Sequence, residues 1–387
     1  MLSFWEKNTF CNYDYIIIGA GITGLSVACE LKENHPNKSV LVLERGLLPT
    51  GASTKNAGFA CIGSLSENLE DIKLMGENAF LQLVQDRWQG LQILRKRLGD
   101  AAIQFEGNGG FELLLKHQNN TFLNKLHDMN KLLLPLFNKP IFSVQTAAAK
   151  TYGLNQNLVD TCVKNEVEGQ INTGQMMLAL QQYAAQLGVQ IITGAAVLSI
   201  TENTQQVSVE TTSICFTAQH LFICTNAFAK QLLPHVTLEP GRGQVLVTTP
   251  IPNLKVKGTF FFDEGYYYFR NFENRIIFGG GRNLDFETEN TLAFGSNQKI
   301  LAQLNYYLQD LILPNTNYEI AHTWSGIMAF GSDKTPLVQN ISERQTIALR
   351  LNGMGVALGS MIALSAVNIT FPSLKVYRIF SYNPFLG

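Results

Sequence analysis

The chain has 387 residues, of which 46% are hydrophobic and 15% charged, and its formal net charge is −1. This length accommodates two or three hydrophobic cores. The composition excludes the low hydrophobicity of a disordered chain and the excess of basic residues of a nucleic-acid-binding protein. We therefore expect a folded protein that has no nucleic-acid partner.

Cysteine and histidine residues are dispersed along the chain. The six cysteines and six histidines form no CxxC, HxxxH or HExxH pair, and such pairs are the spacings that bring metal ligands together. Nothing that resembles a secretory signal precedes the first predicted strand. We therefore expect free thiols, no metal site and a cytoplasmic location.

A strand, a glycine-rich turn and a helix are predicted near the N-terminus. Residues 15–18 form an apolar run, residues 19–24 follow the pattern GxGxxG, and residues 25–31 are small and apolar. In such a unit the first glycine permits a tight turn, the second lets the backbone approach a pyrophosphate, and the third lets the helix pack closely on the strand. The pattern predicts a dinucleotide-binding unit, and a glycine turn without a ligand is the alternative. The residues expected to contact the cofactor here are Gly19, Gly21, Ile22, Thr23 and Gly24.

A second strand is predicted at Val40–Leu43, and Glu44 follows it. Glu44 lies about 20 residues after the last glycine of the motif, where an acidic residue accepts hydrogen bonds from a ribose. NAD-binding and FAD-binding proteins share these features, so they do not distinguish the two cofactors.

The next segment is small and polar, where a nicotinamide-binding unit would build another crossover helix. Residues 50–58 read TGASTKNAG and resemble the GAS-x-x-N-x-G loop of the family of D-amino-acid oxidase, glycine oxidase and sarcosine oxidase. In that family the loop runs from the ribose to the flavin ring, so the resemblance implies FAD as the cofactor. A mobile surface loop is the alternative. The cofactor contacts that the resemblance implies are Arg45, Ala52, Ser53, Thr54, Asn56, Ala57 and Gly58.

The resemblance continues towards the C-terminus. A helix is expected from about Thr173 to Leu187, closed by Gly188, with strands after it at 189–192 and 196–200. Residues 221–227 resemble the family strand that ends in A-T-N-A. Residues 353–357 open the last predicted helix, whose N-terminal N–H groups and dipole favour negative charge on a reduced flavin. These segments add the expected cofactor contacts Val197, which would pack the adenine, Thr225, Gly353, Met354, Gly355, Val356 and Ala357.

Two uncharged stretches are long enough to be compared with membrane spans. Residues 15–29 contain three glycines and are shorter than the ~20 residues needed to cross a bilayer. In the stretch 351–374, only residues 355–367 are solidly apolar. We expect a buried core helix there and no membrane span, which is the alternative.

The expected fold class is an α/β FAD-binding domain of the Rossmann-like, glutathione-reductase type, interleaved with an α+β antiparallel-sheet substrate domain. The cofactor segments fall at 10–75, 150–230 and 322–375, so the FAD-binding domain is discontinuous. Residues 76–149 and 231–321 are expected to build the substrate domain, with the active site where the two domains meet. The second domain is predicted to contain an amphipathic helix at 82–98 and strands at 110–115, 244–248, 259–262, 265–269 and 275–279.

The last two of these strands should pair as a hairpin across residues 270–274. Because side chains alternate along a strand, Tyr266, Tyr268 and Arg270 should share one face. Tyr266 matches the family's substrate-carboxylate tyrosine. Arg282 matches the position of an active-site histidine in sarcosine oxidases, and an arginine there would suit an anionic group. The alternative is aromatic packing of the hairpin with a surface arginine. If the second strand stays regular, its residues Ile276, Phe278, Gly280 and Arg282 should also share a face.

Residues 322–330 resemble the family segment W-x-G-x-R-P, with Trp324 and Gly326 matched, and Gly326 is added to the expected cofactor contacts. Met328 stands where amino-acid and glycine oxidases have the arginine that pairs with the substrate carboxylate. Ala357 and Phe278 likewise replace, respectively, the carboxylate-binding and oxygen-activating lysines of sarcosine oxidases. These departures favour another substrate pose and leave the electron acceptor open.

The pattern YYYFR with WSGIMAF is closest to the amine-oxidising, γ-glutamylputrescine-oxidase-like branch of the family. The resemblance implies an FAD-dependent amine or amino-acid oxidase or dehydrogenase, which oxidises the C–N bond of an amine or N-substituted amino acid by hydride transfer to flavin N5. The resulting imine would be hydrolysed. FAD should be noncovalent, because no cysteine lies in the Trp324 segment. A flavin-binding, non-catalytic subunit of a larger assembly is the alternative, and a nicotinamide-dependent dehydrogenase rests on the glycine motif alone. The expected catalytic residues are Tyr266, Arg282, Trp324, Met328 and Lys55.

Overall fold

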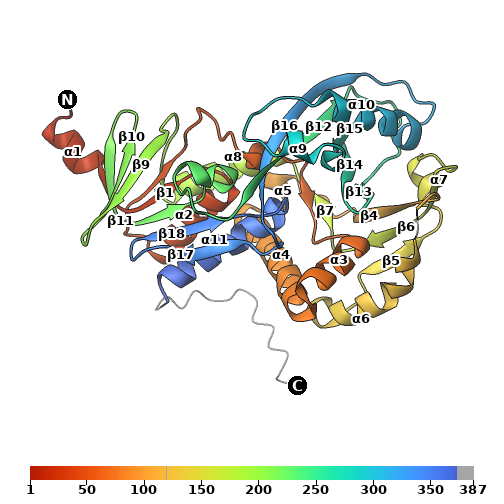
Figure 1. Ribbon diagram of the computed structural model, residues 1–387, viewed down its shortest axis with the longest axis horizontal. Coiled ribbons are helices and arrows are strands. Elements are labelled where there is room, and N and C mark those ends of the chain that lie inside the picture. Colours follow the sequence, from red (N-terminus) through yellow and green to blue (C-terminus); the bar gives the residue numbers. More distant parts are fainter. Residues whose placement is uncertain (119, 373–387) are drawn as a thin grey trace.

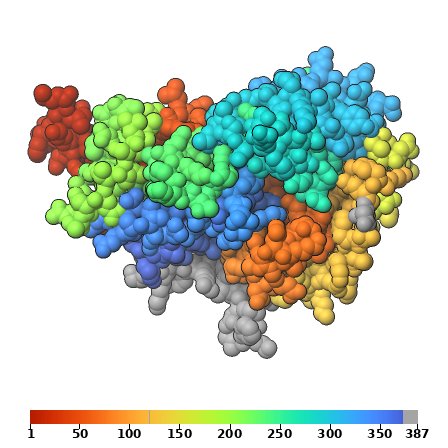
Figure 2. Space-filling model, viewed as in Figure 1, coloured from red at the N-terminus to blue at the C-terminus, as the bar shows by residue number. Residues whose placement is uncertain are grey.

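The computed structural model describes residues 1–118 and 120–372, and it contains two large β-sheets with helices packed on them (Figure 1). The end of the predicted segment 322–375 lies outside the described residues. Helix α1 (Phe4–Phe10) stands at one end of the molecule, where it projects from the surface (Figure 2).

The first sheet contains the predicted dinucleotide-binding unit. Its central strand β1 (Asn12–Ile18) runs parallel to β2 (Val40–Leu43) and to β11 (Cys215–Ile223). The apolar runs of β1 and β2 are buried on both faces, as in parallel sheets that helices cover. From one edge to the other the order is β17 (Leu337–Asn340), β18 (Gln345–Leu349), β11, β1, β2 and β8 (Gln190–Ile192), while β10 (Val207–Thr211) pairs with β11 and β9 (Val197–Glu202) pairs with β10.

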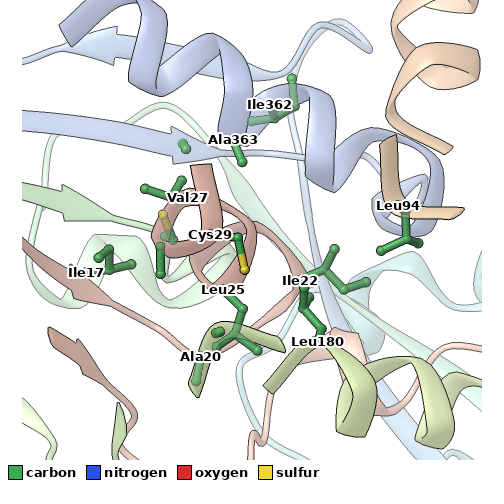
Figure 3. Close-up of a cluster of buried hydrophobic side chains, with 14 of the residues drawn as sticks. Ile17, Ala20, Ile22, Leu25, Val27, Cys29, Leu94, Leu180, Ile362 and Ala363 are labelled. Carbon is green, nitrogen blue, oxygen red and sulfur yellow. The ribbon is translucent and has the colours of Figure 1, made fainter. Parts of the chain in front are cut away.

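Three helices pack together on this sheet. Helix α2 (Ile22–Asn34) begins directly after the glycine turn, and α11 (Gly355–Thr370) contacts both α2 and α4 (Glu77–Leu98). Figure 3 shows Val27 of α2 and Ala363 of α11 in the buried cluster that joins them. The uncharged stretch that was expected to form a core helix is therefore α11.

Glycine allows the close approach of these helices. A Cβ atom at Gly359 of α11 would lie 3.3 Å from Cβ of Ile22, and one at Gly90 of α4 would overlap the Ala357 carbonyl. Among the described residues, no helix combines the length and the apolarity needed to span a membrane.

The second sheet is antiparallel except for one parallel pair, β4 (Gly110–Leu115) with β13 (Thr259–Phe262). On one face, Phe260, Phe269 and Phe278 form a buried aromatic core that also includes residues of α10 (Gln298–Tyr307). The order of its strands is β16 (Ile320–Phe330), β12 (Glu239–Thr248), β15 (Arg275–Gly280), β14 (Tyr267–Phe272), β13 (Thr259–Phe262), β4 (Gly110–Leu115), β6 (Val159–Asn165) and β5 (Phe142–Gln145).

Shorter elements connect and cover the two sheets. A two-stranded sheet joins β3 (Phe59–Ala60) to β7 (Gly169–Gln170) beside the predicted cofactor loop. The remaining helices are α3 (Leu65–Met75), α5 (Asp100–Ile103), α6 (Leu126–Phe137), α7 (Ala148–Tyr152), α8 (Thr173–Gln186) and α9 (Phe286–Glu289), and the short turns include η1 (Ala52–Thr54), η3 (Asn226–Gln231), η4 (Arg282–Leu284) and the π-turn Leu308–Ile312.

The predicted fold class is confirmed, and the sequence also located most elements, with differences at their ends. Strands β6 and β16 fall within segments predicted for the FAD-binding domain, yet they belong to the second sheet. The exact division into domains stays a prediction. The β14–β15 hairpin turns over two residues rather than the expected five, because Phe272 already pairs with Arg275 and Glu273 adopts a left-handed conformation (φ 52°).

Candidate active site

A cavity of about 750 Å³ is lined by residues of both large sheets. It extends from the glycine turn and the end of β2, past the 50–58 loop and the start of α11, to β12, the β13–β14 turn and β16. The volume lies in the range typical of cofactor and ligand sites, about 300–1,000 Å³. Of the predicted cofactor residues, all line it except Gly24, Thr54 and Gly58.

The glycine turn packs against the end of β11. Gly19 has a positive φ of 105°, and a Cβ atom there would lie 2.8 Å from the Cys224 carbonyl oxygen. Gly24 contributes packing only, since a Cβ atom would collide with the Gly19 carbonyl. At the start of α2, the Ile22 N–H donates to Ser53 Oγ at 2.9 Å. This helix N-terminus lines the cavity next to a serine hydroxyl, which is a setting that suits a pyrophosphate.

Glu44 is buried at the end of β2, where backbone groups fix its carboxylate. Oε2 accepts from the Ala20 N–H and Oε1 from the Gly46 N–H, both at 3.0 Å. A carboxylate has about four acceptor positions, so lone pairs remain for the hydroxyls of a ribose. The side chain lines the cavity, as the predicted role requires.

Asn56 organises the loop that follows. Its Nδ2 donates to the Ser53 carbonyl at 2.8 Å, while Oδ1 accepts from the Gly58 N–H at 2.9 Å and from the Thr173 hydroxyl at 3.0 Å. Thr54 instead points to the surface, where its hydroxyl donates to the Pro49 carbonyl.

Trp324 holds the same loop from the second sheet. Its indole Nε1 donates to the Lys55 carbonyl at 2.9 Å, and the ring stacks on His322. Trp324 does not line the cavity, although it was expected among the catalytic residues. Its contacts make it a support for the loop that carries Lys55.

The other end of the cavity has a second set of contacts. The guanidinium of Arg45 lies 3.6 Å above the ring of Phe228, and Val197 lines the wall nearby. The hydroxyl of Thr225, after β11, is buried and has no hydrogen-bond partner among the described residues. A buried polar atom without a partner is costly, so a ligand group at this position would satisfy it.

The start of α11 faces the cavity at a strained turn. Asn352 and Gly353 both have positive φ, 49° and 83°, and residues 353–357 line the wall. The Met354 sulfur lies 3.6 Å from Cys61 Sγ. The N-terminal N–H groups of α11 therefore provide a second position that favours negative charge.

These features fit a dinucleotide with a flavin. The cavity offers two helix N-termini for negative charge, a buried carboxylate for a ribose, an unsatisfied hydroxyl and glycines where the chain must come close. Among the described residues, no group of three or more His, Cys, Asp or Glu is arranged to hold a metal ion.

The fold and this cavity define a protein that binds a dinucleotide cofactor between two sheets. The chain belongs to the DAO family of FAD-dependent oxidoreductases, whose family model matches residues 14–368. FAD is therefore its cofactor, and the protein is an FAD-dependent oxidoreductase.

Relatives and solved structures agree with this assignment. A probable oxidoreductase, OrdL of Haemophilus influenzae, is 24% identical over 361 residues, which cover 89% of this chain and 80% of OrdL. The fold resembles L-proline dehydrogenase of P. horikoshii with a TM-score of 0.76, 18% identity and 97% coverage of both chains. It also resembles glycine oxidase of Geobacillus kaustophilus with a TM-score of 0.75, 21% identity and coverage of 93% of this chain and 95% of that one.

Arg282 also lines the cavity, and it forms no ion pair among the described residues. Its Cζ lies 4.4 Å from the ring of Phe330 and 5.0 Å from that of Phe286, and Nε is buried without a hydrogen-bond partner among the described residues. Burial lowers the pKa of its guanidinium. Gly241 leaves room for this arrangement, because a Cβ atom there would lie 2.7 Å from Cζ.

Arg282 does not continue the face of β15, contrary to the regular-strand expectation. Gly280 and Gly281 have φ values of 123° and 76°, and these left-handed residues turn the chain into η4. Phe278 of β15 points into the aromatic core of the second sheet, where it is fully buried against Phe262 and Phe269. It does not line the cavity, so its match to an oxygen-activating lysine is not supported by its position.

Two tyrosines lie on the same wall as Arg282. Tyr266 is 38% exposed and precedes β14, while Tyr268 points into the cavity, where burial raises its pKa to about 12. Tyr268 was predicted to share a face with Tyr266 but was not assigned to the site. The aromatic contacts that surround Tyr268 include Phe59, and Met328 lies near both Gly243 and Gly353.

The sequence did not predict the contribution of α3. Glu67 and Glu70 of this helix line the cavity, and Lys334 crosses to the same helix, where its Nζ pairs with Asp71 at 2.6 Å. These contacts depend on how α3 packs against the β16–β17 loop. No local motif specifies that packing.

Proposed function

We propose that this oxidoreductase oxidises the C–N bond of an amine or N-substituted amino acid that carries an anionic group, and that Arg282 binds this group. The observation that carries the proposal is the half-buried, unpaired guanidinium of Arg282 between two aromatic rings. A desolvated arginine forms strong, paired hydrogen bonds with a carboxylate.

The surrounding residues suit a substrate that is polar at one end. Tyr268 stays protonated at neutral pH, so its hydroxyl can donate to a substrate oxygen or accept from an amine. Met328 and Phe59 provide an apolar wall that excludes water from the reacting carbon. Bound FAD supplies the two-electron oxidation, and water then hydrolyses the imine product.

The names of the similar proteins support a substrate of this type. Glycine oxidase and L-proline dehydrogenase are named for amino acids in which an amine stands beside a carboxylate. Because Met328 replaces their family's usual arginine, we propose that Arg282 receives the anionic group from a different direction. We also propose that the predicted cofactor residues that line the cavity bind FAD noncovalently and that Lys55 acts beside the flavin. The expected cytoplasmic location is part of the same proposal.

The proposal is tested by anaerobic mixing of the FAD-loaded protein with glycine, N-methylglycine, L-proline and γ-glutamylputrescine, and with putrescine as an amine without a carboxylate. We expect loss of the yellow flavin absorbance with at least one of the carboxylates and not with putrescine. Absence of reduction by every compound would favour the non-catalytic alternative.

Arg282→Met provides the residue-level test. Loss of the paired anion should weaken transition-state binding of the carboxylate substrate by about 2–5 kcal/mol, seen in kcat/KM. Arg275→Met is the matched control, because Arg275 only donates to the Thr248 carbonyl and does not line the cavity. Equal kcat/KM values for the wild type and Arg282→Met would contradict the assignment.

A further inference from the structure

Behind the cofactor loop lies a buried arginine that forms no ion pair among the described residues. Arg270 of β14 is 3% exposed. Its Nε donates to the Ala57 carbonyl, Nη2 donates to the Ile171 carbonyl at 2.9 Å, and Nη1 donates to the Asn271 carbonyl at 3.3 Å. None of the ion pairs among the described residues includes it.

Other buried arginines of this protein are neutralised. Arg87 pairs with Asp71, Arg97 with Glu30 and Arg242 with Glu289. Burying a charge without a counter-charge costs several kcal/mol, and carbonyl dipoles recover only part of that cost. The carboxylate of Glu106 acts on Arg270 electrostatically without forming an ion pair, and its effect on the pKa is smaller than that of burial. The charge of Arg270 is therefore expected to interact with any negative charge that forms nearby.

The position of Arg270 is fixed by its surroundings. Gly58 has a φ of 78°, and a Cβ atom there would lie 2.6 Å from Arg270 Nη2. The guanidinium thus occupies the space that the missing side chain of Gly58 leaves. It joins the second sheet to the 50–58 loop and to Ile171, two residues before α8, and it cannot turn away without breaking these bonds.

Only the loop separates Arg270 from the cofactor cavity. Ala57, which accepts the Nε hydrogen bond, lines the cavity, and so do Phe59 and Tyr268 of the same apolar cluster. These neighbours are apolar or buried, so the field of the charge is weakly screened in this direction. Burial lowers the pKa of Arg270 to about 10, which still leaves it protonated at neutral pH.

We propose that Arg270 is a positioning residue that also supplies a fixed positive charge to stabilise the reduced state of the bound FAD. Two-electron reduction of the flavin with uptake of one proton adds one negative charge to it. A cation held behind the loop favours that charge and so raises the reduction potential. This role goes beyond the proposed function, because it is independent of which substrate donates the electrons.

The potential of the bound flavin measures this effect directly. The FAD-loaded wild type, Arg270→Gln and Arg270→Lys are titrated anaerobically with dithionite in the presence of a reference dye. We expect a more negative potential for Arg270→Gln and a potential closer to the wild type for Arg270→Lys, since lysine keeps the charge. Arg97→Gln is the control, because it removes a buried cation that is paired with Glu30 and Glu33 and does not line the cavity.

Equal potentials for the wild type and Arg270→Gln would overturn the proposal. If Arg270→Gln does not retain FAD, the proposal is tested instead by the pH dependence of the flavin reduction potential in Arg270→Lys. A lysine buried at this position has a lowered pKa, so the potential should fall more steeply with rising alkaline pH than it does in the wild type. Parallel pH profiles would then count against a role for the charge.

Discussion

Gly58 shows how one residue of the 50–58 loop serves the packing between the two sheets. The family resemblance implied that Gly58 contacts the cofactor, yet it does not line the cavity. Its lack of a side chain makes room for the Arg270 guanidinium and for the Ile171 carbonyl. A motif glycine can therefore be essential for the loop without touching the ligand.

Gly58→Ala should destabilise the protein by about 2 kcal/mol or more, because alanine disfavours a φ of 78° and its Cβ atom would collide with Arg270. We expect a lower midpoint in urea unfolding and weaker retention of FAD on gel filtration. Gly51→Ala in the same loop is the control for the unfolding measurement, since its φ is −75° and no protein atom lies within 4 Å of an added Cβ. Similar losses in both variants would contradict this explanation.

Residue patterns predicted the cofactor half of the site better than the substrate half. The glycine turn, Glu44 and the 50–58 loop are contiguous motifs whose spacing the cofactor itself dictates, so the sequence could locate them. Glu67 and Lys334 are brought to the cavity only by packing between distant segments. No pattern within either segment indicates that contact.

The segment that contains η4 and α9 is the element that positions Arg282. Glu289 at the end of α9 is fully buried and accepts hydrogen bonds from Arg242 at 2.8 and 2.9 Å, from Gln244 at 2.9 Å and from Asn297 at 2.9 Å. Figure 1 shows α9 beside β12, the strand that carries Arg242 and Gln244. The anchor therefore fixes one end of a short segment whose other end carries Arg282.

Glu289→Gln should loosen this segment and raise KM for a carboxylate substrate severalfold, with a smaller change in kcat at saturation. Steady-state kinetics on the substrate identified by flavin reduction provides the measurement. Glu30→Gln is the control: it removes another buried carboxylate paired with an arginine, but on α2 and away from Arg282. An unchanged KM in Glu289→Gln would show that η4 holds Arg282 by itself.

Alternation along strands predicted the faces of β14 correctly, because Tyr267 and Phe269 lie in the aromatic core while Tyr268 and Arg270 face the cofactor loop. The same rule failed for Arg282. The backbone conformation of Gly280 and Gly281 ends the strand, and period-two patterns carry no information about where a glycine adopts positive φ.

At the scale of the whole molecule, buried carboxyl groups make the stability depend on pH. Burial raises the pKa of Glu168 to about 7 from a reference of 4.5, and it does the same for Glu112. The folded state therefore binds more protons than the unfolded state between these values. These two glutamates therefore stabilise the folded state fully below a pH of 4.5, the pKa of a glutamate in the unfolded chain. This stabilisation is lost as the pH rises through about 7, their pKa in the folded protein.

Glu168→Gln should remove this dependence at one site. The difference in unfolding free energy between the wild type and Glu168→Gln should fall by up to about 3 kcal/mol between about pH 4 and pH 8. Urea unfolding of both proteins across this range provides the difference. His220, whose pKa burial lowers to about 4, acts in the opposite direction in both proteins and so cancels. A difference that does not vary with pH would place the Glu168 pKa near its ordinary value.

The interleaving of the two sheets has a consequence for biosynthesis. Strand β1 and helix α2 come from the first part of the chain, but α11, which packs on α2, and β18, which lies two strands from β1 in the same sheet, come from residues 345–370. A growing chain therefore cannot complete its first core until α11 has left the ribosome. Contacts of such large sequence separation fold slowly and leave apolar surface exposed meanwhile. The protein is thus expected to depend on chaperones during synthesis more than its final compactness suggests.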